Sequence, residues 1–304
     1  MFAEAAYSMG LVKNREKILN EAVQHFKKAL EINPYHEKAR KALDNVTKKS
    51  FNDGNRAYKR GDLDGALESY YKVLEFDEKF YQAHYQIGVI KAKMGDRNGA
   101  IGHYQQALDI NPNFYKGWYA MGLSKKAISN NEGALASFEA AVNVHPAYDK
   151  AFGAMGEIYL SEKKYDQAIE VLNTAVQVNS KYSKGYSTLG VIYSEMEEWA
   201  NAANNLVLAT THNEKDAMAW YRLAVAYNQL DECDRAEEAA RNSTDRKPSF
   251  GGGWIELGVA TWCGGKGNKV ASVNALEKAR KDRTWRKIAE YEMDRIMNPQ
   301  KYQN

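Results

Sequence analysis

Histidines are the first residues of this 304-residue chain to test for chemistry, because two imidazoles on one helix face can hold a metal ion. The six histidines are His25, His36, His84, His103, His145 and His212. No two of them have the i, i+4 spacing that would place both rings on one face of a helix. We therefore predict no metal site and no cofactor, and we expect His84 to have a structural role in packing.

The two cysteines and one glycine-rich segment lack the context that catalysis requires. Cys233 is expected in a turn and Cys263 near a helix end, without a pattern that would activate either thiol. We expect each to be a small filler or an exposed thiol, and a disulfide framework is not predicted. The segment from Gly264 to Gly267 has neither the earlier Gly nor the Ser or Thr of a phosphate-binding loop. We therefore predict that the protein is not an enzyme.

Composition and charge narrow the class of protein further. The chain has 44% hydrophobic residues, which suits a folded protein, and no apolar run approaches the length of about 18 residues that a membrane span needs. With 42 Lys and Arg against 39 Asp and Glu, the net charge of +3 is too small to imply a nucleic-acid surface. The first residues lack the basic and apolar regions of a signal peptide, which favours a cytoplasmic location. The alternative is an exported or periplasmic chain whose leader has been removed.

Internal repeats carry the prediction of the fold. Short segments that end in glycine recur every 34 residues, at 86–88, 120–122, 154–156 and 188–190. A set of Ala, a large apolar residue and Ala follows in each unit, so each unit is predicted to form two amphipathic helices. We expect the small residue at position 8 of a unit to face the Ala at position 20, as Gly122 would face Ala134.

These units resemble tetratricopeptide repeats, whose pattern is Trp, Leu-Gly, Tyr, Ala, Phe, Ala and Pro at positions 4, 7, 8, 11, 20, 24, 27 and 32. The unit that begins at Tyr115 matches best, with Trp118 at position 4 and Phe138 at position 24. The resemblance implies an all-α, right-handed superhelical solenoid of about eight helix-turn-helix repeats with a C-terminal capping helix. The expected repeats are 1–36 (atypical or truncated), 47–80, 81–114, 115–148, 149–182, 183–216, 217–250 and a degenerate one at 251–284. A helical insertion is expected at 37–46, and the capping helix and tail at 285–304.

In this family the first helices of successive repeats line a concave groove, and positions 2, 5, 6, 9 and 12 meet the ligand. Lysine occupies position 2 in three consecutive repeats, and tyrosine occupies position 5 in three repeats. The residues expected to contact a partner are Tyr85, Lys116, Tyr119, Lys150, Lys184, Tyr221 and Arg222. The alternative is that the lysines are solvated and that the tyrosines pack against the next repeat.

The function that the resemblance implies is a non-catalytic scaffold or adaptor, which binds a peptide segment or partner protein and assembles complexes. The partner would offer acidic and apolar side chains to the groove, and no nucleic acid is expected. The co-chaperone clamp of this family is not predicted, because no Lys at position 5 accompanies an Asn at position 9.

The expected oligomeric state is a monomer or a weak dimer. A self-associating structural protein is an alternative, because Phe2, Tyr7, Met9 and Leu11 could be exposed on the first helix. A second alternative is that the chain is the repeat-containing part of a larger multidomain protein.

Overall fold

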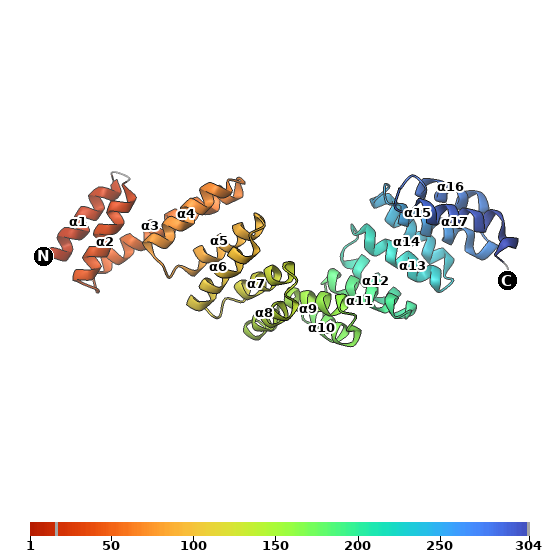
Figure 1. Cartoon of the computed structure of the whole chain (residues 1–304), viewed down its shortest axis with the longest axis horizontal. Helices are drawn as coiled ribbons and strands as arrows, with labels where there is room; N and C mark the ends of the chain where they lie inside the picture. Colours follow the sequence, from red (N-terminus) through yellow and green to blue (C-terminus); the bar gives the residue numbers. More distant parts are fainter. Residues whose placement is uncertain (16–17, 303–304) are drawn as a thin grey trace. The chain divides into compact units, whose positions relative to one another are not determined.

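The computed structural model describes residues 1–15 and 18–302. Within these residues the chain forms seventeen α-helices, two short 3-10 helices and no β-strand. The helices fall into two compact units, Met1–Pro146 with α1 to α8 and Ala147–Asn304 with α9 to α17 (Figure 1). The all-α fold class predicted from the sequence is confirmed.

The helix bounds follow the order of the chain. The first unit contains α1 (Phe2–Arg15), α2 (Leu19–Ile32), α3 (Glu37–Lys59), α4 (Leu63–Phe76), α5 (Tyr81–Lys93), α6 (Arg97–Ile110), α7 (Tyr115–Ala127) and α8 (Asn131–Val144). The second contains α9 (Asp149–Ser161), α10 (Tyr165–Val178), α11 (Ser183–Glu195), α12 (Trp199–His212), α13 (Ala217–Gln229), α14 (Cys233–Arg246), α15 (Gly251–Trp262), α16 (Lys269–Ala279) and α17 (Arg286–Met297). The 3-10 helices are η1 (Cys263–Gly265) and η2 (Pro299–Lys301).

Consecutive helices pack as antiparallel pairs, from α1 with α2 to α15 with α16. A residue with left-handed backbone conformation lies in the turn inside a pair and recurs every 34 residues, at Gly61, Gly95, Ser129, Lys163, Glu197, Asp231 and Gly265. After four of these turns an Asp or Asn caps the second helix, at Asp62, Asp96, Asn130 and Asn268. Asp62, Asp96 and Asn130 each accept a hydrogen bond from the backbone N–H three residues further on. The repeated sequence thus produces the same kind of turn in the six pairs from α3–α4 to α13–α14.

The small residue at position 8 makes room for a large side chain of the second helix. A Cβ added to Gly122 would lie only 2.5 Å from the ring of Phe138, at position 24. A Cβ on Gly88 would likewise lie 2.6 Å from the ring of Tyr104. The glycine is required because the ring of the second helix lies directly on the first helix.

The two ends of the array depart from the regular pair. The segment 37–46 lies inside α3, a single helix of 23 residues that continues into the first helix of the next pair. At the other end, α17 packs against α16 and α15 and buries Ala289 and Ile296. No helix in the described part of the chain combines the length and apolarity that a membrane span needs.

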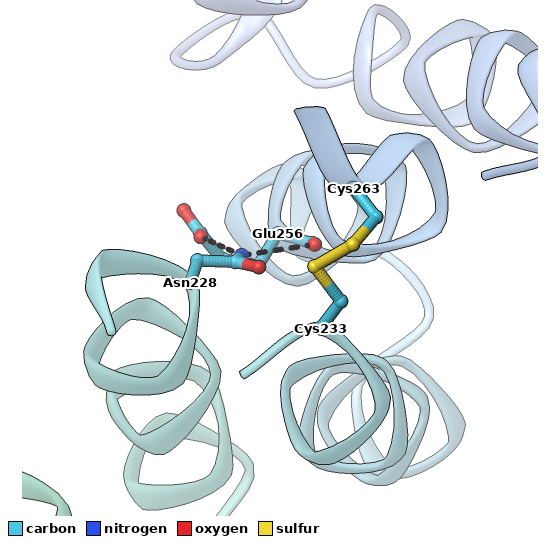
Figure 2. Close-up of a disulfide and its surroundings, with 4 residues drawn as sticks. All are labelled: Asn228, Cys233, Glu256 and Cys263. Carbon is cyan, nitrogen blue, oxygen red and sulfur yellow. Dashed lines mark hydrogen bonds between the residues drawn. A yellow bond between two sulfur atoms is a disulfide. The ribbon is translucent and has the colours of Figure 1, made fainter. Parts of the chain in front are cut away.

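A disulfide joins Cys233, the first residue of α14, to Cys263, which follows α15 (Figure 2). The prediction that both cysteines are fillers or free thiols is therefore wrong. The physical reason lies in the turn after α15, where Cys263, Gly264 and Gly265 all have left-handed φ. The six pairs from α3–α4 to α13–α14 each have one such residue in this turn. The longer turn places Cys263 beside the start of α14, with 5.7 Å between the two Cα atoms.

Candidate functional site

A pocket of about 600 Å³ opens on the second unit, across the first helices α9, α11 and α13. Its lining residues are Glu157, Leu160, Ser161, Ser183, Lys184, Ser187, Thr188, Val191, Asn213, Asp216 and Arg222. Two of the predicted contact residues, Lys184 and Arg222, are brought together here. The pocket therefore lies on the surface formed by the first helices of the pairs, which we call the first-helix face.

The two cations of the pocket differ in how their charge is balanced. Lys184 Nζ lies 2.5 Å from Oε1 of Glu157, so a carboxylate on the neighbouring helix compensates it. Arg222 donates a long hydrogen bond, 3.4 Å from Nη1 to Oγ of Ser187. Within the described residues Arg222 has no ion-pair partner. Because a guanidinium carries five N–H donors, Arg222 has donors left for an acceptor that enters the pocket.

The remaining polar groups of the lining largely serve the fold. Asp216 caps α13, since its Oδ1 accepts the backbone N–H groups of Met218 and Ala219. Thr188 donates its hydroxyl to the backbone carbonyl of Lys184, 2.9 Å away. These hydrogen bonds lie within the helices that line the pocket. Arg222 is therefore the group of the lining that is best placed to bind an anion.

Lys150 and Tyr221 also belong to the second unit, but neither lines the pocket. Lys150 is exposed at the second position of α9. Tyr221 packs edge-on against Phe250 and Trp285, with ring centroids 5.1 and 5.8 Å away. Burial, with a smaller contribution from Glu256, raises the pKa of Tyr221 to about 12.

The other predicted contact residues lie in the first unit. Tyr85 packs edge-on against Phe114 at 4.9 Å between ring centroids, and burial raises the pKa of its hydroxyl. The ring of Tyr119 lies 5.6 Å from that of Phe138. Lys116 is exposed, with Nζ 5.8 Å from the centroid of the Tyr115 ring. The tyrosine rings therefore take part in packing, whether or not their outer edges also meet a partner.

Two histidines from different helices meet in the first unit, which the search along single helices missed. Nδ1 of His84 on α5 lies 3.4 Å from Nδ1 of His103 on α6, and Nε2 of His84 lies 3.3 Å from the carbonyl oxygen of Glu78. Burial, followed by the charge of His84, lowers the pKa of His103 to about 4. The signal that could have found this pair is the contact between positions 4 and 23 of one helix pair. In the part of the chain that the structure describes, no three His, Cys, Asp or Glu side chains gather to hold a metal ion.

A second polar contact that the sequence analysis missed lies near the disulfide. Asn228 Nδ2 donates to Oε2 of Glu256 at 2.8 Å and to the backbone carbonyl of the same residue at 3.2 Å (Figure 2). Burial raises the pKa of Glu256 to about 7, and the carboxylate of Glu292 on α17 adds to this effect. The contact links α13 to α15 through a carboxyl group that is poorly solvated.

Comparisons with known families agree with the paired helices. Sequence models of the tetratricopeptide repeat match residues 3–36, 54–95 and 81–114. A model described as the tetratricopeptide repeat protein 21 C-terminal ARM domain matches residues 119–243. The DnaJ homolog subfamily C member 7 of Mus musculus is 40% identical over 77 residues, which is 25% of this chain. The chain spans only 16% of the length of that relative.

Several solved structures share the fold. PilF of Pseudomonas aeruginosa is 18% identical, with a TM-score of 0.61 over 71% of this chain and 96% of that chain. YrrB, described as a TPR protein with an unusual peptide-binding site, is 18% identical, with a TM-score of 0.54 over 62% of this chain and 96% of that chain. A chain of the APC/C hetero-tetramer Cut9–Hcn1 is 15% identical, with a TM-score of 0.58 over 97% of this chain and 55% of that chain. At these identities the likeness establishes the fold alone. The repeat matches and the paired helices together show that the chain belongs to the tetratricopeptide repeat family.

Proposed function

We propose that this protein is a non-catalytic scaffold that binds a peptide segment or partner protein on its first-helix face and so helps to assemble a complex. Tetratricopeptide repeats generally mediate protein–protein interactions, and proteins of this family are generally not catalysts. The observation that carries the proposal is the pocket across α9, α11 and α13, where Arg222 has hydrogen-bond donors to spare. A carboxylate of the partner would satisfy that guanidinium with two parallel hydrogen bonds.

The contact residues predicted from the sequence remain part of the proposal. In the second unit Lys150, Lys184, Tyr221 and Arg222 would meet the partner, with Lys184 exchanging Glu157 for an incoming carboxylate. In the first unit the contact residues would be Tyr85, Lys116 and Tyr119. The apolar side of the partner would lie on the tyrosine edges, and its acidic side chains near the cations.

Affinity capture from the native lysate, read by mass spectrometry, tests this proposal. One variant combines Lys184→Glu and Arg222→Glu, and a second combines Tyr119→Ala with Lys116→Glu. The matched control combines Lys269→Glu and Lys287→Glu, two exposed lysines of the second unit that do not line the pocket. A protein retained by wild type and control but lost from the pocket variant supports the proposal. Equal retention by all four, once circular dichroism has shown that each folds, contradicts it.

Self-association is the second candidate function, and one observation favours it. Phe2 is 80% exposed and Met9 is 47% exposed on α1, although Tyr7 and Leu11 pack with Phe26. We still propose a monomer or weak dimer, because this apolar stripe lies on a single helix. Light scattering over a dilution series should give a mass near 34.3 kDa at low concentration. Self-association would be favoured instead by a stoichiometric oligomer that persists on dilution. The double variant Phe2→Ser, Met9→Ser should then be a monomer.

A further inference from the structure

Two links hold α15 to the preceding helix pair. Glu256 lies inside α15, and Cys263 follows the last residue of that helix in a left-handed turn. Glu256 accepts the hydrogen bond from Asn228 on α13, and Cys263 is bonded to Cys233 on α14 (Figure 2). One link is therefore a hydrogen bond to a poorly solvated carboxyl group, and the other is covalent.

The helix α15 has little intrinsic helix stability. It begins with three glycines, Gly251 to Gly253, which favour the unfolded chain, and its N-cap residue Phe250 offers no side-chain hydrogen bond. The turn after it contains three further glycines, and the following α16 has 11 residues against the 14 of α14. Asn268 caps α16 and Ile255 and Leu257 are buried, but the turn between α15 and α16 is longer than the turns of the first unit. The disulfide thus adds a constraint to a helix whose first residues and following turn are rich in glycine.

We propose that Cys233 and Cys263 form a reversible redox latch, which a dithiol reductant opens and which, once open, loosens α15, η1 and α16 from the preceding pair. One thiolate of the dithiol attacks a sulfur of the disulfide and forms a mixed disulfide, and its second thiolate then closes a disulfide within the reductant. The protein accepts two electrons and two protons and is left with two thiols. Both cysteines are partly exposed, so the reductant reaches the bond in the folded protein.

This latch would respond to the compartment in which the protein is found. An oxidising compartment keeps the disulfide closed and the last pair attached. A reducing one opens it, and α15 is then held by the Asn228–Glu256 contact and by apolar packing. The proposal does not depend on the scaffold function, because it concerns the stability of the last pair and not the pocket.

Hydrogen exchange measured by mass spectrometry, with and without dithiothreitol, tests the latch on the whole chain. Purified without reductant, the protein should show no free thiol after denaturation, and dithiothreitol under native conditions should release two thiols per chain. Amides of α15, the following turn and α16 should then exchange at least tenfold faster, while those of the first unit and of α9 to α12 stay unchanged. Removal of dithiothreitol in air should restore the slow exchange.

A variant with Cys233→Ser and Cys263→Ser keeps the proposal testable without reductant. It should show the fast exchange of the reduced protein, confined to the same segments, and no response to dithiothreitol. Free thiols in the protein purified in air would overturn the proposal. So would a disulfide that resists dithiothreitol in the folded state, an exchange pattern that reduction leaves unchanged, or a loosening spread evenly over both units.

Discussion

At the scale of single residues, the contact between position 8 and position 24 decides how closely two helices of a pair approach. We predict that Gly122→Ala lowers the free energy of unfolding by about 1–3 kcal/mol, because the added Cβ would clash with the ring of Phe138. Gly102 is the matched control, since it lies inside α6 with open space around it. Gly102→Ala should raise the free energy of unfolding by about 0.5–1 kcal/mol through helix propensity. Urea unfolding followed by circular dichroism measures both, and equal effects of the two substitutions would contradict the packing described here.

The histidine pair makes the first unit sensitive to acid. The pKa of His103 falls from its ordinary 6.5 to about 4, mainly through burial and then through the charge of His84, whose own pKa is also lowered by burial. Between pH 6.5 and about pH 4 the His103 ring is therefore protonated in the unfolded chain and neutral in the folded chain. The neighbouring charges of Lys91 and Asp96 oppose each other and leave this direction unchanged.

We predict that the stability of the first unit falls as the pH is lowered from 6.5 to 4, and that His103→Gln removes much of this dependence. Hydrogen exchange of α5 and α6 amides over this pH range, corrected for intrinsic exchange, measures the effect. His25→Gln, at a histidine outside the pair, should leave the dependence unchanged. A dependence that survives His103→Gln in full would show that the pair is not its source.

At the scale of helices, a tryptophan at position 4 ties three of the pairs to the loop that precedes them. The indole Nε1 of Trp118 donates to the carbonyl oxygen of Pro112 at 2.8 Å, and Trp220 and Trp254 donate to Glu214 and Pro248 in the same way. Trp118→Phe keeps the apolar contact and removes the bond, so we predict a loss of about 0.5–1.5 kcal/mol. Trp118→Ala removes both and should cost about 3–5 kcal/mol. Thermal unfolding compares the two, and equal losses would mean that the ring contributes nothing beyond its hydrogen bond.

The Glu256 carboxyl gives the second unit the opposite pH dependence. Its pKa is raised from 4.5 to about 7, so the folded chain holds a proton between these values that the unfolded chain has lost. The contribution of this carboxyl group to the free energy of unfolding is therefore fully present below pH 4.5, and it is lost as the pH rises through about 7. The groups that face it are Asn228 and Tyr221 on α13 and Glu292 on α17.

We predict that Glu256→Gln stabilises the α13–α15 contact above pH 7 and has little effect near pH 5. Exchange of α15 amides at pH 5 and pH 8 measures this. Glu290→Gln, at an exposed carboxylate of α17, is the control. If Glu256→Gln destabilised α15 equally at both pH values, the carboxylate would be a favourable partner of Asn228 rather than a poorly solvated group.

At the scale of the whole molecule, the 34-residue period explains why the helix pairs could be predicted. Most pairs repeat a small residue, a turn and a large apolar residue at the same positions, so the pattern that predicts one pair predicts the others. Position 24 was not recognised as the neighbour of position 8, because spacing along single helices does not give the contact between them. The same limit hid the contact of His84 with His103.

The disulfide escaped prediction for a different reason. Cys233 and Cys263 are 30 residues apart, and their approach depends on a turn that breaks the regular pattern. In the candidate site, the repeat register placed Lys184 and Arg222 on one surface, but the pairing of Lys184 with Glu157 depends on how neighbouring pairs stack. The helices and the surface they share were thus accessible from the sequence, and the side-chain contacts between helices were not.

The division of the described chain into two compact units bears on how it unfolds. In repeat proteins each pair contacts mainly its neighbours, so stability is distributed along the chain. Because the shifted pKa of His103 weakens the first unit at low pH and that of Glu256 weakens the second at high pH, the stability of the first unit relative to the second should rise between pH 4.5 and 8. Exchange of α5 and α15 amides at the two pH values, corrected for intrinsic exchange, tests this, and a relative stability that stays constant or falls would contradict it.

The central claim is that the first-helix face of the second unit binds a carboxylate-bearing segment of a partner protein. The most direct measurement is the dissociation constant of a partner captured by the wild type, determined by titration calorimetry against Arg222→Lys, Arg222→Gln and the Lys269→Glu, Lys287→Glu control. The account predicts at least tenfold weaker binding for Arg222→Gln, an intermediate loss for Arg222→Lys, and binding within about twofold of wild type for the control. Unchanged affinity in both Arg222 variants, with the partner still bound, would contradict it.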